Sequence, residues 1–109
     1  MEKCQSHKNA NADCLAREAS LPVIDSAGES LFIQERINTP TWLNLQKTSS
    51  SSWRWVNGSS MDYYTKWLPG QPVSLPDHSC AVVENRGIVS GWRVENCTAC
   101  RNTLCKKGI

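Results

Sequence analysis

The chain of 109 residues lacks long apolar runs, runs of like charge and recognisable catalytic motifs. No apolar stretch approaches the ~20 residues of a membrane-spanning helix, so the sequence predicts no membrane span. The formal net charge is only +2, with 12 basic and 10 acidic residues mixed along the chain, which argues against nucleic acid as a partner. No carboxylate pair or nucleophile has a catalytic setting, so we expect a binding protein and not an enzyme.

The N-terminus also lacks the apolar segment of a signal peptide, since Met1 is followed directly by Glu2 and Lys3. The chain does contain six cysteines, which are Cys4, Cys14, Cys80, Cys97, Cys100 and Cys105. An even number of cysteines in a short chain is typical of a disulfide framework, which predicts a secreted protein. Met1 is then interpreted as a start residue in place of a removed signal. The alternative is a cytosolic protein with reduced thiols, which the high cysteine content disfavours.

The cysteines lie towards the two ends of the chain, and none lies between Cys14 and Cys80. This distribution indicates that the two ends are joined covalently. A bridge that spans ~90 residues removes on the order of 4–5 kcal/mol of denatured-state entropy in the chain-entropy model. That contribution matters because the core of so small a domain is only marginally sufficient. We expect residues 1–109 to form one domain, since the length does not fit two.

The residues before Pro40 are expected to form two helices. The first is predicted to bury one apolar stripe and to begin at an asparagine cap. The stripe consists of Ala12, Leu15, Ala16 and Ala19, and the candidate caps are Asn9 and Asn11. Ser26 with Glu29 three residues later forms a capping box, which predicts the start of the second helix. The apolar positions of this helix include Leu31, Ile33 and Ile37, and it is expected to end ahead of Pro40.

The residues after Pro40 are expected to form short strands and loops. The predicted strands are 41–46, 53–55, 80–84, 88–94 and 101–106. Three prolines and a glycine predict an irregular loop over residues 69–77. Asn57-Gly58 predicts a tight turn, and with Ser59 it forms a glycosylation sequon.

Several motifs occur in a characteristic order and spacing. They are Trp42-Leu43-Asn44-Leu45, Trp53-Arg54-Trp55-Val56-Asn57-Gly58, Trp67-Leu68-Pro69-Gly70-Gln71-Pro72, and the set Cys80, Trp92, Cys97 and Cys105. From about Asn9 to Lys106, the chain thereby resembles a C-type lectin-like domain. The resemblance implies an α+β fold in which two helices pack on small antiparallel sheets beside a long irregular loop, stapled by disulfides. It also assigns all five tryptophans to the framework, whereas His7 is expected at the surface.

The resemblance also implies a set of disulfides. The implied pairs are Cys14–Cys105 and Cys80–Cys97. Cys4 and Cys100 remain, and a third bridge between them fits because the N-terminal strand of this fold lies beside the C-terminal one. Cys97 and Cys100 also form a Cys-x-x-Cys, a pattern of redox dithiols and of zinc sites, the latter with Cys105 and His78 as further ligands. We favour two structural bridges, because a zinc site leaves Cys14 and Cys80 unexplained.

Sugar-binding members of the family hold a calcium ion at the long loop, and calcium takes 6–8 oxygen ligands. Here the ligand triplet is Gln71-Pro72-Val73, whose third position is apolar. His78 stands at the acidic position before Cys80, and Arg93-Val94 replaces the ligand pair after Trp92. These replacements remove oxygen ligands and add a positive charge. The resemblance therefore predicts that the usual calcium site is absent or very weak, and no cofactor is certain.

A different metal is a second hypothesis. A histidine beside a carboxylate suits zinc better than calcium. Asp77 and His78, with Glu95 nearby in sequence, form a candidate zinc site with an open position for a glycan hydroxyl. The alternative is that Asp77 and His78 are ordinary exposed loop residues.

Two functions remain open. The first is a secreted lectin that binds carbohydrate on microbial or cell surfaces in innate immune recognition, without ordinary calcium ligation. The second is a module that binds a protein ligand, as in family members that lost their calcium ligands. The candidate ligand-binding residues are Gln71, Asp77, His78, Arg93, Glu95, Asn96 and Tyr64.

Overall fold

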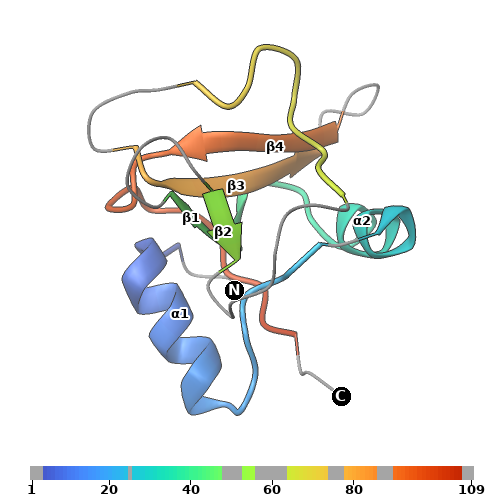
Figure 1. Cartoon of the computed structure of the whole chain (residues 1–109). Coiled ribbons are helices and arrows are strands. Elements are labelled where there is room, and N and C mark those ends of the chain that lie inside the picture. The colour runs from blue at the N-terminus through green and yellow to red at the C-terminus, as the bar shows by residue number, and fades with distance from the viewer. Residues whose placement is uncertain are drawn as a thin grey trace.

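The computed structural model of the chain describes residues 4–24, 26–47, 53–55, 64–73, 78–85 and 90–106. These residues contain two helices followed by four strands, as Figure 1 shows. The elements are α1 (His7–Ala16), α2 (Ala27–Gln34), β1 (Thr41–Lys47), β2 (Trp53–Trp55), β3 (Cys80–Asn85) and β4 (Ser90–Glu95). The expected α+β class is confirmed. The predicted turn at Asn57-Gly58 lies outside the described residues.

Both helices begin at a serine cap. The Oγ of Ser26 accepts a hydrogen bond from the backbone N–H of Glu29 at 3.2 Å, so the predicted start of α2 is confirmed. At α1 the cap is Ser6, whose Oγ accepts from the backbone N–H of Asn9 at 3.3 Å. The expected asparagine caps are therefore wrong, because α1 starts ahead of both asparagines.

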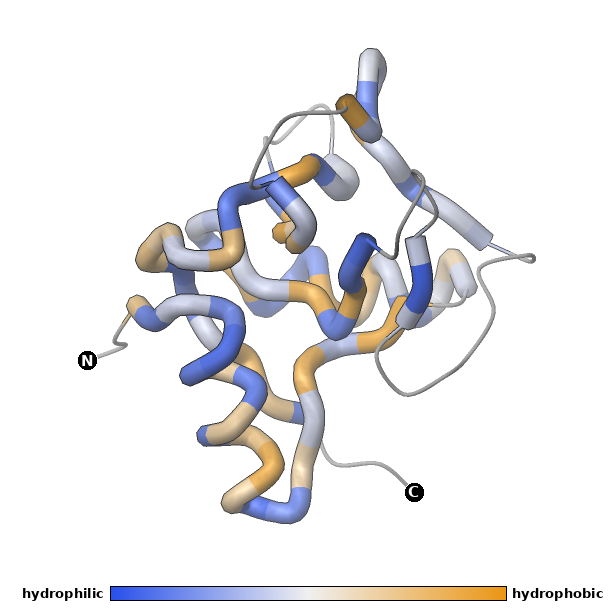
Figure 2. The backbone as a smooth tube through the Cα atoms, turned by 60° about the vertical axis from the view of Figure 1, so that its left-hand side comes forward, coloured by the Kyte–Doolittle hydropathy of each residue, from blue (hydrophilic) through white to orange (hydrophobic). Residues whose placement is uncertain are grey.

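Three of the four residues of the predicted apolar stripe of α1 are exposed, and the fourth, Ala19, is buried but lies beyond the end of the helix. The buried face of α1 consists of His7, Ala10 and Cys14, whereas Leu15 is 60% exposed. Figure 2 shows mainly hydrophilic residues at the start of this helix and hydrophobic ones in its last turn. Cys14 is drawn inward by its disulfide, and this turns the face that the stripe was expected to bury towards solvent. In α2, Ile33 is buried as expected, but Leu31 is exposed.

The four strands form one antiparallel sheet in the order β2-β1-β3-β4. β1 is buried on both faces, because alternate residues of a strand point to opposite sides. Leu43 and Leu45 enter one apolar cluster together with Ile33 of α2. Trp42 enters a second cluster together with Ala10 and Cys14 of α1. Each helix therefore covers a different part of the core, and the two helices stand well apart in Figure 1.

The five tryptophans belong to this framework, as the resemblance implies. Trp42, Trp55 and Trp92 are almost completely buried, and Trp53 and Trp67 are half-buried against the first cluster. The rings of Trp55 and Trp67 meet the ring of Trp92 edge-on, at centroid distances of 5.4 and 5.5 Å. This is a favoured geometry for aromatic pairs.

His7 is buried and not at the surface, contrary to expectation; its exposed fraction is 3%. Its Nε2 lies 3.0 Å from the carbonyl oxygen of Leu43 and its ring meets Trp42 edge-on. Because a carbonyl oxygen only accepts, Nε2 carries the hydrogen. Burial lowers the pKa of His7, and the hydrogen bond to Leu43 only partly opposes this effect. The first residue of α1 thus docks the helix onto β1.

Residues 101–106 do not form the predicted strand. They make isolated bridges to three separate segments instead, pairing Arg101 with Gln5, Asn102 with Thr41 and Lys106 with Ser20. Because each partner belongs to a different segment, no continuous ladder develops. The C-terminal segment therefore ties together parts of the chain that are distant in sequence.

Three disulfides reinforce these contacts, and they are the pairs that the sequence analysis favours. Their Cα–Cα distances are 4.9 Å for Cys4–Cys100, 5.3 Å for Cys14–Cys105 and 5.1 Å for Cys80–Cys97. Cys97 and Cys100 belong to different bridges, so in this structure the Cys-x-x-Cys is neither a closed redox pair nor half of a zinc site.

Candidate functional site

The segment 66–71 runs along β4, which is the edge strand of the described sheet. The backbone N–H of Trp92 donates to the carbonyl oxygen of Lys66 at 2.8 Å. The backbone N–H of Leu68 donates to the carbonyl oxygen of Trp92 at 2.9 Å. These hydrogen bonds place the start of the long loop against the strand that carries several of the candidate ligand-binding residues.

Gln71 continues this pairing with its side chain. Its Oε1 accepts hydrogen bonds from the backbone N–H of Val94 at 3.1 Å and of Val73 at 3.4 Å. The amide oxygen that the sequence left as a calcium ligand is therefore bound to backbone donors. Gln71 satisfies a donor on the open edge of β4, which would otherwise lack a strand partner.

Four charged side chains form what we call the charge cluster: Glu84, Arg93, Glu95 and Arg101. Alternate residues of β3 and β4 share one face, and Arg93 lies opposite Val82, so Glu84, Arg93 and Glu95 project on the same side of the sheet. Arg93 Nε pairs with Glu84 Oε1, and Arg93 Nη1 lies 3.0 Å from Glu95 Oε2. Arg101 Nε donates to the same Glu95 oxygen at 2.7 Å. Two positive and two negative groups thus alternate across the cluster.

Glu95 is the centre of the charge cluster, and its side chain is only 9% exposed. Its Oε1 accepts from the backbone N–H of Asn96 at 3.0 Å, so both carboxylate oxygens have protein donors. Burial alone would raise the pKa of Glu95, but the hydrogen bonds from Arg101, Asn96 and Arg93 outweigh it and hold the pKa below its usual value. Glu95 is therefore an anion at neutral pH.

Arg93 is charged for the same reason. Burial would lower the pKa of Arg93, but the hydrogen bonds and charges of Glu84 and Glu95 outweigh burial and raise it. The cluster places a fixed guanidinium on the face of β4 where the resemblance expects metal ligands.

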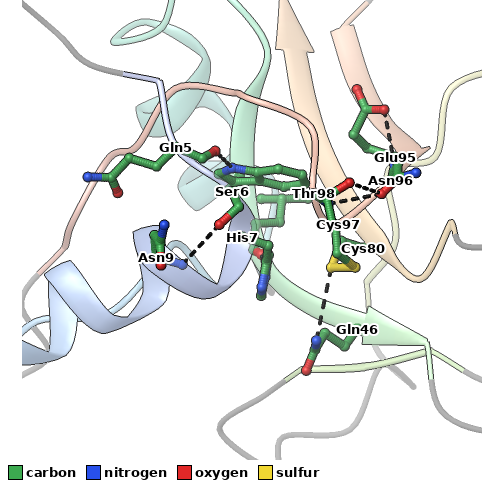
Figure 3. The surroundings of a disulfide bond; sticks show 12 residues. Gln5, Ser6, His7, Asn9, Gln46, Cys80, Glu95, Asn96, Cys97 and Thr98 are labelled. Atoms are coloured by element: carbon green, nitrogen blue, oxygen red, sulfur yellow. Dashed lines mark hydrogen bonds between the residues drawn. A yellow bond between two sulfur atoms is a disulfide. The ribbon is translucent and has the colours of Figure 1, made fainter.

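The other candidate residues lie in different settings. Asn96 Oδ1 accepts from the backbone N–H of Thr98 at 2.9 Å and from its hydroxyl at 2.8 Å. Figure 3 shows Asn96 and Thr98 beside the Cys80–Cys97 disulfide. Tyr64 is half-buried, with its ring edge-on to Trp92 at 6.3 Å.

His78 is half-buried just ahead of β3, and Asp77 lies outside the described residues. Within the part of the chain that the structure describes, no three histidine, cysteine, aspartate or glutamate side chains gather as metal ligands. Glu95, the third residue of the candidate zinc site, is bound to two arginines.

Sequence reasoning missed two members of the charge cluster, Glu84 and Arg101. Each was assigned only to a strand. Alternation along β3 and β4 places Glu84 beside Arg93 once the register is known, but the sequence does not supply the register. The bond between Arg101 and Glu95 depends on the C-terminal segment returning to the sheet, which no local pattern indicates.

The architecture defines a protein of the C-type lectin fold, as solved structures show. The C-type lectin domain of murine dendritic cell inhibitory receptor 2, solved in complex with an N-glycan, superposes with a TM-score of 0.89 at 24% identity, covering 98% of this chain and 87% of that one. A calcium-independent type II antifreeze protein superposes with a TM-score of 0.87 at 22% identity, covering 98% of this chain and 82% of that one. At these identities the similarity shows the fold alone.

The chain belongs to the Lectin C-type domain family, because residues 3–107 match the sequence model of that family. A curated relative, the CD209 antigen of Papio hamadryas, is 30% identical over 105 residues. The alignment covers 91% of this chain but only 28% of that relative. Among the described helices, none is long and apolar enough to cross a bilayer.

Proposed function

We propose that this domain binds carbohydrate on microbial or cell surfaces without a calcium ion at the position usual for the family. C-type lectin domains often bind calcium. The proposal therefore depends on whether the side-chain oxygen atoms near this position are available to bind a cation. One observation carries it: both oxygens of Glu95 and the amide oxygen of Gln71 already accept hydrogen bonds from protein donors. A cation at this place would have to displace two guanidinium groups from Glu95.

Electrostatics adds to this argument. Arg93 is held on the face of β4 by Glu84 and Glu95. A divalent ion beside it would be repelled by the guanidinium, and the half-buried position reduces screening by solvent. In this proposal, the guanidinium of Arg93 provides the positive charge that a calcium ion provides in calcium-binding members of the family.

The same residues offer groups suited to sugar hydroxyls. Arg93 presents the Nη2 end of its guanidinium, because Nε and Nη1 donate to Glu84 and Glu95. Asn96 presents the nitrogen of its carboxamide, and Tyr64 presents a half-buried aromatic ring. The solved neighbour with an N-glycan shows that this fold can carry glycan-binding sites. We propose that Gln71, Arg93, Glu95, Asn96 and Tyr64 form or support the binding surface, and that the protein is secreted and acts in innate immune recognition.

The remaining candidates, Asp77 and His78, belong to a zinc-dependent form of this proposal. In that variant, a zinc ion beside the long loop takes part in holding the glycan, and sugar binding depends on zinc.

A second function, binding of a protein ligand, is favoured by one observation. Leu31 and Phe32 are neighbours on α2 and are 55% and 40% exposed. The guanidinium of Arg36 lies 3.6 Å from the centre of the Phe32 ring. Exposed apolar side chains next to an aromatic ring and an arginine are common at protein interfaces.

A glycan array with washes in EDTA, calcium or zinc tests the proposal. We expect the same signal with EDTA and with calcium, and loss of signal in Arg93→Gln. Arg54→Gln is the matched control, because Arg54 is exposed on β2 and the substitution changes the net charge equally. Since Arg93→Gln removes the ion pair between Arg93 and Glu84, Arg93→Lys is tested beside it, and the fold of each variant is checked by circular dichroism.

Three outcomes would contradict the proposal or redirect it. A signal that EDTA removes and calcium restores would show that the calcium site is functional. A signal that only zinc restores, and that His78→Ala removes, would establish the zinc variant. No glycan signal under any condition would favour the protein ligand, and Phe32→Ser should then reduce partner binding.

A further inference from the structure

A pocket of ≈ 310 Å³ lies at the place where the two ends of the chain meet. Its lining consists of Cys4, Thr39, Pro40, Cys100, Arg101 and Asn102. These residues come from three segments that are distant in sequence, so the pocket is a product of the tertiary fold. Its volume is at the lower end of the ~300–1,000 Å³ typical of small-molecule sites.

The pocket is held open by covalent and backbone contacts. The Cys4–Cys100 bridge forms part of its wall. Arg101 and Gln5 exchange two backbone hydrogen bonds of 3.0 and 2.8 Å. The backbone N–H of Asn102 donates to Pro40 at 3.2 Å, and its carbonyl oxygen accepts from Trp42 at 3.0 Å. A ligand therefore meets a largely preformed site and pays little ordering entropy.

The pocket is lined by one cationic side chain, two neutral polar side chains and an apolar wall. The side chain of Arg101 is 36% exposed, and Glu95 holds it through Nε at 2.7 Å. The terminal nitrogens of a guanidinium so held retain the fork that binds a carboxylate with two parallel hydrogen bonds. Thr39 and Asn102 add a hydroxyl and a carboxamide, while Pro40 and the disulfide supply the apolar surface.

We propose that this pocket binds a carboxylate-bearing monosaccharide, with its carboxylate on Arg101 and its hydroxyls on Thr39 and Asn102. The pocket is separate from the proposed surface along β4 and does not depend on glycan binding there. The buried Glu95 connects the two, because its carboxylate bonds both Arg93 and Arg101. Glucuronate and N-acetylneuraminate are two sources of the same chemistry, a sugar ring with a carboxylate.

The test is a titration of isotope-labelled protein with monosaccharides, followed by NMR chemical shifts of backbone amides. We expect glucuronate, N-acetylneuraminate or both to shift the amides of residues 100–102, and the arm that shifts them identifies the source. Glucose, which lacks the carboxylate, should leave them unchanged. Arg101→Lys keeps the charge but loses the fork, and should weaken binding about 10-fold.

Because Arg101→Lys also disturbs Glu95, a second variant fills the pocket without changing charge. Thr39 is exposed, so Thr39→Trp should fold normally and abolish the shifts. Arg54→Gln, remote on β2, should bind as the wild type does. Equal shifts with glucose or with acetate would overturn the assignment to an acidic sugar. Shifts that persist in Thr39→Trp would overturn the assignment to this pocket. Neither result bears on the metal dependence of the glycan array.

Discussion

Removal of the Cys4–Cys100 bridge should lower the free energy of unfolding by less than the sequence separation of its two cysteines suggests. The two cysteines are 96 residues apart, and in the chain-entropy model an isolated loop of that size corresponds to about 4.7 kcal/mol. The bridge does not close an isolated loop, however. Cys14–Cys105, with a separation of 91 residues, already joins the two ends.

With Cys14–Cys105 in place, Cys4–Cys100 closes only the ring made of residues 4–14 and 100–105. This ring contains 17 residues, close to the size of about 15 for which the same model gives about 3 kcal/mol. Cys4 and Cys100 are both exposed, so their replacement by serine leaves no buried cavity. We therefore expect Cys4→Ser/Cys100→Ser to lower the free energy of unfolding by about 3 kcal/mol.

The third bridge provides a matched comparison. Cys80–Cys97 closes a ring of similar size, with a separation of 17 residues, but Cys80 is completely buried. Its replacement by alanine should cost the same entropy and a further ~1–2 kcal/mol for the lost packing of the sulfur. Both variants can be measured by urea denaturation at neutral pH, with the m-value compared to detect a more expanded denatured state.

Two results would refute this reasoning. A loss close to 4.7 kcal/mol for Cys4→Ser/Cys100→Ser would show that the bridges act as independent long loops. Equal losses for the exposed and the buried bridge would show that burial of Cys80 contributes nothing. Both measurements use reversible unfolding of the ligand-free protein, so neither depends on the ligand.

Two further predictions concern single residues. Because the pKa of His7 is lowered from 6.5 in the folded state, the unfolded state takes up the proton first as the pH falls. The contribution of neutral His7 to the free energy of unfolding is therefore complete above pH 6.5 and is lost below it. Urea denaturation between about pH 5.5 and 7.5 should show this slope, and His7→Asn should flatten it; an unchanged slope would contradict the buried neutral imidazole. At Gly91 an added Cβ would fall on the carbonyl oxygen of Lys66, so Gly91→Ala should cost about 1–3 kcal/mol by separating segment 66–71 from β4. Gly28→Ala on α2, where the nearest atom is 4.0 Å away, should instead stabilise by about 0.5–1 kcal/mol, and a loss in thermal or urea unfolding would contradict the account.

The sequence by itself determined the features that depend on local chemistry. The capping box at Ser26 marked the start of α2, and alternation marked strands β1 and β2. A short apolar run marked β3, and the turn that follows it marked the returning strand β4. The order and spacing of cysteines and tryptophans identified the family. These signals are carried by neighbouring residues or by a fixed spacing, so they can be recognised before any contact is known.

Only the tertiary structure decided which groups meet. The burial of His7, the three separate bridges of residues 101–106 and the bonds of Glu95 to Arg93 and Arg101 all join segments that are distant in the chain. Register and docking set these contacts, and a shift of one residue would turn each strand side chain to the other face. The family fold was therefore readable from the sequence, whereas the contacts of the charge cluster were not.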